Sequence, residues 1–253
     1  MRVKDATQRF SSRVDHYVRY RPGYPTDILG LLKSECDLTP DSVIADIAFG
    51  TGIFTRLLVE NGNRVFGVEP NAGMRQAGEQ FLQHYPTFTS VEGTAEATTL
   101  PEHCVDIITA AQAGHWFDPE KAVREFKRIL KPDGWLVLLW NDRRMDSTEF
   151  QREYEQLLCA YGTDYEDVRR TGATLAVERF FSQSFRRREF EYKQMLDYAG
   201  LEGRLLSSSY IPQRDHSQYD SMLRELRRMF DRHQVNGSVS FDYDTRVYYG
   251  QLA

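Results

Sequence analysis

The sequence lacks the features of a membrane-spanning or secreted protein. Its longest purely apolar run, WLVLLW at 135–140, is far shorter than the roughly 20 residues that cross a bilayer. The first dozen residues, MRVKDATQRFSS, contain no apolar segment of the kind found in signal peptides. The three cysteines, Cys36, Cys104 and Cys159, fit neither a disulfide framework nor a zinc site. We therefore expect a cytoplasmic protein with structural thiols, no metal and no membrane contact.

The chain also lacks an excess of positive charge. Its formal net charge is −5, with 27% charged and 41% hydrophobic residues, which gives no general attraction to nucleic acid. Arginine clusters at 143–144, 169–170, 186–188 and 227–228 are interspersed with acids, so solvated faces are expected. Arg143 and Arg144 are also candidates for binding an acidic substrate, because they follow a predicted strand. We expect a small-molecule partner, whereas the sequence does not indicate the oligomeric state.

Apolar strands alternate with amphipathic helices up to Trp140. The predicted strands are 43–48, 64–69, 88–93, 105–112 and 135–140, and the predicted helices are 26–35, 53–62, 71–84 and 119–131. Asp118 is the expected N-cap of the last of these helices. Five such alternations predict an open, doubly wound α/β sheet that is mostly parallel and has helices on both faces.

After Trp140 the pattern changes. Residues 147–160 and 164–181 read as helices without a strand between them, which indicates an insertion packed over the sheet. Strand-like segments at 185–192 and 237–252 flank a predicted helix at 217–234. Such a late pair often closes a sheet with an antiparallel edge. The expected fold is therefore a seven-stranded, Rossmann-like sheet with an antiparallel edge strand and a helical lid insertion.

A glycine-containing loop, DIAFGTG at 46–52, follows the first predicted strand. It keeps Gly50 and Gly52 but has Ala48 two positions earlier, and neither register supplies the third glycine of a dinucleotide-binding loop. Glu69 ends the second predicted strand, where a carboxylate can accept hydrogen bonds from both ribose hydroxyls of a nucleoside. The missing third glycine favours a nucleoside ligand without a pyrophosphate.

The order and spacing of several segments resemble the class I S-adenosylmethionine-dependent methyltransferases. These segments are VIADIAFGTGIFTRLL, VFGVEPN, VEGTAEATTLP, VDIITAAQAGHWFD and EFKRILKPDGWLVLLW, within about residues 40–140, and YVRYRPGYP at 17–25 extends the resemblance. Within that superfamily the chain resembles type 11-like small-molecule enzymes, including trans-aconitate methyltransferase-like proteins. The resemblance implies S-adenosyl-L-methionine as cofactor, S-adenosyl-L-homocysteine as product, and a carboxylate or other oxygen nucleophile as acceptor.

The resemblance also implies the cofactor-binding residues. The loop at 46–52 would lie beside the methionine part, Glu69 would bind the ribose, and Ala95 and Glu96 would contact the adenine. The whole implied set is Tyr17, Arg21, Asp46, Ala48, Gly50, Gly52, Glu69, Pro70, Asn71, Met74, Ala95, Glu96, Ala111 and Gln112. Ala48 stands where the family has glycine, and alanine is excluded there only if φ is positive or a methyl group has no room.

Tyr17, Tyr20, Arg21 and Tyr24 precede the core and have two interpretations. They form a lid whose arginine binds a carboxylate of the cofactor or substrate and whose rings enclose the sulfonium. Alternatively, the rings simply pack on the edge of the sheet. Tyr17 and Arg21 are the better candidates for cofactor contacts.

The segment AQAGHWF at 111–117 follows the fourth predicted strand and would line the meeting point of cofactor and substrate. His115 is the candidate catalytic base, although it also fits a pocket-lining or a structural role. A carboxylate acceptor is already ionised at pH 7 and needs no base. Trp116, Trp140 and Arg143 complete the predicted substrate contacts, with His115 among them.

We predict a single methyltransferase domain over 1–253. It comprises an N-terminal lid or helix at 1–38, a cofactor-binding core at 39–140, a helical insertion over the active site at 141–184, and C-terminal strands and a helix at 185–253. Two other functions stay open. One is a catalytically silent protein that binds S-adenosylmethionine or a nucleoside; the less favoured one is an NAD-dependent oxidoreductase, since no Tyr-x-x-x-Lys motif is present. RNA methylation is weakly supported by the charge.

Overall fold

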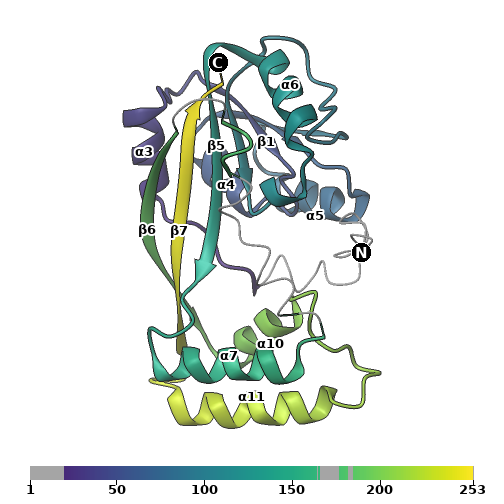
Figure 1. Ribbon diagram of the computed structural model, residues 1–253, viewed down its shortest axis with the longest axis vertical. Coiled ribbons are helices and arrows are strands. Elements are labelled where there is room, and N and C mark those ends of the chain that lie inside the picture. Colours follow the sequence, from purple (N-terminus) through teal and green to yellow (C-terminus); the bar gives the residue numbers. More distant parts are fainter. Residues whose placement is uncertain (1–19, 164, 166–176, 182–184, 253) are drawn as a thin grey trace.

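A twisted sheet with helices on both faces forms the upper part of the molecule, and a helical layer lies below its lower end (Figure 1). The computed structural model describes residues 20–163, 165, 177–181 and 185–252. In chain order the elements are α3 (Asp27–Glu35), β1 (Val43–Ile47), α4 (Ile53–Glu60), β2 (Arg64–Val68), α5 (Ala72–Leu82), β3 (Phe88–Val91), β4 (Val105–Ala111), the 3₁₀ turn η2 (Gly114–Trp116), α6 (Pro119–Ile129), β5 (Leu130–Arg143), α7 (Glu149–Tyr161), β6 (Arg186–Leu196), α10 (Tyr198–Leu206), α11 (Tyr219–His233) and β7 (Val239–Gln251).

The seven strands lie in the order β3-β2-β1-β4-β5-β7-β6. The first five are parallel to their neighbours, and β7 pairs antiparallel with both β5 and β6. The predicted doubly wound, mostly parallel sheet with an antiparallel edge pair is therefore confirmed. The strand order reverses between β1 and β4. Ligands of such sheets bind outside the carboxyl ends of the strands at this switch point.

Each face of the sheet carries its own hydrophobic core, because alternate strand residues point to opposite faces. On one face, strand residues pack with α6; its members include Ala45, Ile47, Ile108, Leu136, Leu138, Ala122 and Phe126. On the other face, strand residues pack with α3 and α4; its members include Ile44, Val65, Ile107, Val137, Ile28, Leu32, Phe54 and Leu58. These two cores fix the strands whose carboxyl ends build the site.

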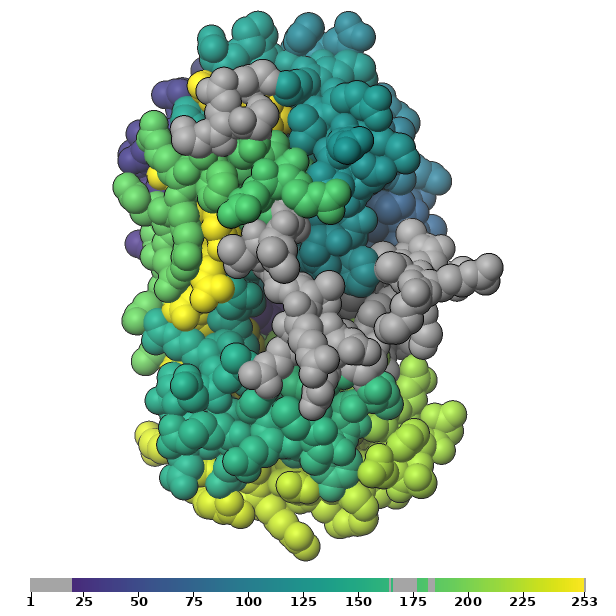
Figure 2. Space-filling model, viewed as in Figure 1, coloured from purple at the N-terminus to yellow at the C-terminus, as the bar shows by residue number. Residues whose placement is uncertain are grey.

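A third core lies in the helical layer. It joins α7, α10 and α11 to the ends of β6 and β7, with Tyr154, Leu201, Leu226 and Phe241 among its buried members. In the space-filling view, α7 and α11 form the lower part of the visible face (Figure 2). The helical layer packs on strands that extend beyond the parallel sheet, since β5 continues to Arg143.

Several boundaries differ from the sequence prediction. The strand expected at 135–140 covers Leu130–Arg143, the strand expected at 185–192 extends to Leu196, and α10 was not predicted. At the end of β5, the polar residues Asn141 and Asp142 pair with Thr245 and Asp244 of β7, so no apolar alternation marks this extension. Of the helix predicted at 164–181, only residues 165 and 177–181 are described, and Val177 and Phe180 pack in the core beside α6.

The proposed division into a lid at 1–38, a core, and an insertion over the active site stays a prediction. Tyr17 lies outside the described residues. In the part of the chain that the structure describes, no helix combines the length and the hydropathy needed to span a membrane.

Candidate active site

The loop after β1 has three residues with left-handed backbone. Gly50 and Gly52 have φ values of 60° and 82°, and Ala48 has a φ of 55°. The amide of Ala48 donates a hydrogen bond to the carbonyl of Val68 at 2.7 Å, which ties the bend to β2. A left-handed conformation costs an L-residue about 1–2 kcal/mol. The positive φ therefore makes alanine unfavourable at position 48. The loop keeps the backbone shape typical of glycine, under strain.

Replacing Ala48 by glycine is expected to stabilise the fold by about 0.5–1 kcal/mol, since relief of strain exceeds the extra chain entropy of glycine. Denaturant unfolding followed by circular dichroism measures the change. Ala160→Gly, the same change at an exposed position of α7, is the matched control and should destabilise by about 1 kcal/mol. Equal destabilisation by both substitutions would contradict the assigned backbone strain.

Bulky Phe49 fits into this loop because two glycines leave room for its ring. A side chain at Gly67 would come within 2.8 Å of the ring, and one at Gly78 would meet the ring and lie 2.9 Å from the carbonyl oxygen of Gly50. Phe49 is only 6% exposed and packs edge-on against Phe88, with the ring centres 5.4 Å apart. The ring thus anchors the loop between β2 and α5.

Glu69 links this loop to the second strand. One carboxylate oxygen accepts a hydrogen bond from the amide of Gly50 at 3.0 Å, and the other accepts one from the amide of Asn71 at 2.8 Å. Burial raises the pKa of this carboxyl group, and both amides counteract the rise. Each oxygen has a further lone pair for a ligand hydroxyl. Glu69 therefore has the fixed position that a ribose-binding carboxylate needs.

Asp46 stabilises the loop at the end of β1, and both of its carboxylate oxygens already accept hydrogen bonds. It is 1% exposed, and it accepts hydrogen bonds from the hydroxyls of Thr55 at 2.6 Å and Thr109 at 2.8 Å. Burial raises its pKa to about 6, against the lowering effect of the two threonines. These contacts join β1 to α4 and β4. In the same loop, the hydroxyl of Thr51 is buried and has no hydrogen-bond partner among the described residues.

The other predicted cofactor residues lie around the start of α5 and in the loop after β3. Asn71 caps α5 by accepting a hydrogen bond from the amide of Met74, whose side chain lies over Gly50. Ala95 is buried, and one carboxylate oxygen of Glu96 accepts a hydrogen bond from the amide of Asp118 at 2.9 Å. Pro70 joins Glu69 to Asn71. Their contacts with a cofactor stay predictions.

The turn after β4, like the loop after β1, contains a residue other than glycine with left-handed backbone. Gln112 follows Ala111 with a φ of 59°, and its amide donates to the carbonyl of Leu139 at 2.8 Å. Positive φ in a residue other than glycine is uncommon and concentrates at functional sites. Ala48 and Gln112 therefore place two left-handed residues at the carboxyl ends of the neighbouring strands β1 and β4, where the strand order reverses.

His115 lies in the 3₁₀ turn η2 beyond Gln112. Its ring lies 4.7 Å from that of Trp116, and no described residue hydrogen-bonds it. The side chain is exposed, yet the surrounding protein lowers its pKa to about 4 by desolvation. The imidazole is therefore neutral at pH 7. Trp140 is 2% exposed, its ring lies against Gly114 beneath this turn, and its indole N–H has no partner among the described residues.

Comparison with known proteins agrees with this geometry. A family model described as a methyltransferase domain matches residues 45–138. A structure described as a "putative type II methyltransferase" of Anaeromyxobacter dehalogenans has a TM-score of 0.67 at 21% identity, covering 92% of this chain and 98% of that one. At that identity the likeness shows the fold. The family match covers the part of the chain from β1 to β5 that builds the site described above.

Two relatives with methyltransferase names are similar in sequence. One, from Mycobacterium tuberculosis, is 36% identical over 140 residues, which are 55% of this chain and 55% of that protein. The chain thus aligns with about half the length of this relative. A methyltransferase-like protein of Schizosaccharomyces pombe is 27% identical over 244 residues, 94% of this chain and 93% of that protein.

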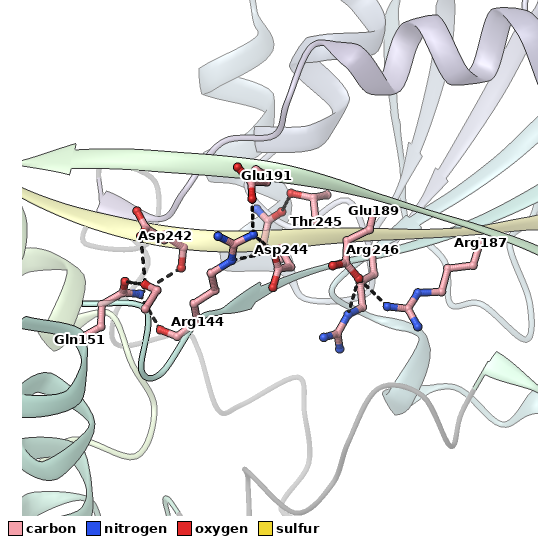
Figure 3. A network of polar contacts seen from close by, with 11 residues as sticks. Arg144, Gln151, Arg187, Glu189, Glu191, Asp242, Asp244, Thr245 and Arg246 are labelled. Carbon is pink, nitrogen blue, oxygen red and sulfur yellow. Dashed lines mark hydrogen bonds and ion pairs between the residues drawn. The ribbon is translucent and has the colours of Figure 1, made fainter. Parts of the chain in front are cut away.

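The two adjacent arginines at the end of β5 point to different partners. Arg144 donates to Asp244 at 2.6 Å and to Glu191 at 2.7 Å, within a polar network that continues along β6 and β7 (Figure 3). Arg143 instead pairs with Glu155 of α7 and donates to the hydroxyl of Tyr165 at 3.1 Å. Arg144 is neutralised by two carboxylates, so of the two arginines only Arg143 stays a candidate for binding a substrate anion.

Arg21 and Asn141 connect the N-terminal segment to the site. Arg21 donates to the carbonyl of Ser207 at 3.0 Å, so the structure directs it toward α10. Asn141 donates to the carbonyl of Gly23 at 2.8 Å, and its own carbonyl accepts from the amide group of Gln112 at 3.3 Å. Sequence reasoning missed Asn141, although its place directly after Trp140 at a strand end was a usable signal. Within the described residues, no group of three or more potential metal ligands is gathered.

Proposed function

We propose that this protein transfers a methyl group from S-adenosylmethionine to a small-molecule acceptor with an oxygen nucleophile. The observation that carries the proposal is Glu69, a buried carboxylate held by the amides of Gly50 and Asn71 between the ends of β1 and β2. The match to a methyltransferase-domain model supports the same proposal, since the matched residues 45–138 contain this arrangement.

The residues present fit the cofactor. The buried hydroxyl of Thr51 lacks a partner among the described residues, and Glu69 has lone pairs for the two ribose hydroxyls. A third glycine, which a pyrophosphate would require, is absent from the loop. Bound S-adenosylmethionine supplies an electrophilic methyl group on a sulfonium. The loop at 46–52 and Glu69 would hold it, with Ala95 and Glu96 beside the adenine.

The chain's own contribution to catalysis is alignment and exclusion of water, which are the main demands of an in-line displacement. His115 is neutral at pH 7 because desolvation lowers its pKa to about 4. A neutral imidazole accepts a hydrogen bond from an acceptor hydroxyl and orients it; with an ionised carboxylate acceptor, it only lines the site. Trp116 would line the acceptor site, and Trp140 supports the turn from the core beneath it.

Calorimetric titration of the full chain with S-adenosylmethionine, S-adenosylhomocysteine and NAD tests the proposal. We expect binding of the first two and none of NAD. Binding of NAD alone would favour the oxidoreductase and refute the proposal. Product formation is then measured with a panel of small acids, phenols and amines; binding without turnover of any acceptor would favour a catalytically silent protein.

A further inference from the structure

Arg204 of α10 has a buried guanidinium group, which no described acidic side chain neutralises. The residue is only 8% exposed, and its Nε and Nη1 donate to the hydroxyls of Tyr243 at 3.2 Å and Ser208 at 3.3 Å. Among the described residues, no carboxylate forms an ion pair with it. A guanidinium has five N–H donors, of which these two long bonds to neutral hydroxyls use two. Burying such a cation is costly unless a negative charge compensates it.

Arg143 approaches the same place from the end of β5. One of its terminal nitrogens pairs with Glu155, while the other, Nη1, is buried and has no hydrogen-bond partner among the described residues. Its guanidinium carbon lies 5.2 Å from the centre of the Tyr154 ring. Burial raises the pKa of Tyr154, and both Arg204 and Arg143 act to lower it. Both guanidinium groups therefore act on one buried tyrosine, and Arg143 lies over its ring.

Four tyrosines surround the two arginines. We call this set, Arg143, Arg204, Tyr154, Tyr165, Tyr210 and Tyr243, the Arg–Tyr cluster. Tyr165 and Tyr210 are in contact, with ring centres 4.9 Å apart, and the hydroxyl of Tyr165 bonds to Glu155 at 2.7 Å. Of the described acidic residues, only Glu155 forms an ion pair with either guanidinium group. Tyrosine hydroxyls and guanidinium N–H groups together suit a carboxylate or a phosphate.

We propose that the Arg–Tyr cluster binds an anionic group, a carboxylate or phosphate, of the methyl-accepting substrate. Arg143 lies four residues beyond Leu139, the partner of the last residue of β4, and so about 13 Å further along the strand. The anionic group is therefore a recognition group separate from the methyl-accepting atom near His115. As substrate recognition the proposal rests on the proposed function; as anion binding it does not.

Thermal unfolding of the full chain in increasing sodium phosphate or sodium malonate, at ionic strength matched with sodium chloride, tests the site. We expect either or both anions to raise the midpoint above the chloride baseline; the stronger effect distinguishes phosphate from carboxylate recognition. Arg204→Met should weaken the apparent anion affinity roughly tenfold or more. Its midpoint in chloride should not fall, because an uncompensated buried charge has been removed. Arg228→Met, an exposed position of α11, is the matched control and should behave as wild type.

Three results would overturn the anion site: no shift in the wild-type protein, an equal shift in Arg204→Met, or a midpoint of that variant well below wild type in chloride, which indicates a structural arginine. Arg204→Lys provides a second test, since it keeps the charge but loses the planar, two-pronged donor geometry and should show an intermediate affinity. Titration of the wild-type protein with S-adenosylmethionine is read separately. Failure of that titration alone refutes the proposed function and leaves the anion measurement intact.

Discussion

Glu69→Ala is expected to weaken binding of S-adenosylmethionine by about 1–3 kcal/mol, the scale for losing hydrogen bonds to a charged group. The substitution removes the acceptor for two ribose hydroxyls and also releases the amides of Gly50 and Asn71. Calorimetric titration measures the change, which corresponds to roughly 5- to 150-fold in the dissociation constant.

Glu92→Ala is the matched control for Glu69→Ala. Glu92 follows β3, its side chain is 78% exposed, and it pairs with Arg75 outside the loop. We expect it to leave cofactor affinity unchanged. Glu69→Gln separates loss of charge from loss of shape, because the amide keeps one acceptor oxygen. Unaltered affinity in Glu69→Ala would rule out the ribose-binding role.

Gly78→Ala is expected to destabilise the protein by about 1–3 kcal/mol, although glycine-to-alanine changes within helices usually stabilise. Gly78 lies within α5, and an added methyl group would meet the Phe49 ring and approach the Gly50 carbonyl to 2.9 Å. Denaturant unfolding measures the loss. Because the clash falls on the loop beside Glu69, cofactor affinity should decline as well.

Gly30→Ala gives the comparison, because Gly30 is exposed in α3 with no atom near the added methyl group. It should stabilise by about 0.5–1 kcal/mol. The double variant Phe49→Ala/Gly78→Ala should lose less stability than the sum of its single variants, since the ring is then absent. Stabilisation by Gly78→Ala would mean that the ring does not occupy this place.

The sequence predicted the parallel part of the fold well because its strands are buried on both faces and its helices carry apolar stripes. Glu69 and the loop at 46–52 could be placed for the same reason, since the ends of such strands meet at one edge. The positive φ of Ala48 could not be read from the sequence. It depends on the bond of the Ala48 amide to Val68, a contact across two strands.

The antiparallel extension was harder to predict, because its polar residues satisfy one another over long sequence distances. Arg144 pairs with Asp244, and Arg246 with Asp142, both across β5 and β7. No feature of the sequence predicted the burial of Arg204. An arginine in an amphipathic helix is normally solvated, and its burial arises from β7 and the segment after α10, which supply Tyr243 and Ser208.

Strand β7 contributes side chains to all three hydrophobic cores. Tyr248 packs beside α6, Val247 and Tyr249 pack on the opposite face, and Phe241 and Tyr243 pack in the helical layer. The layer therefore cannot be excised, or exchanged with that of a relative, at a loop boundary without cutting through a continuous strand. Any chimaera designed to change acceptor choice must transplant the lower halves of β5, β6 and β7 together with α7, α10 and α11.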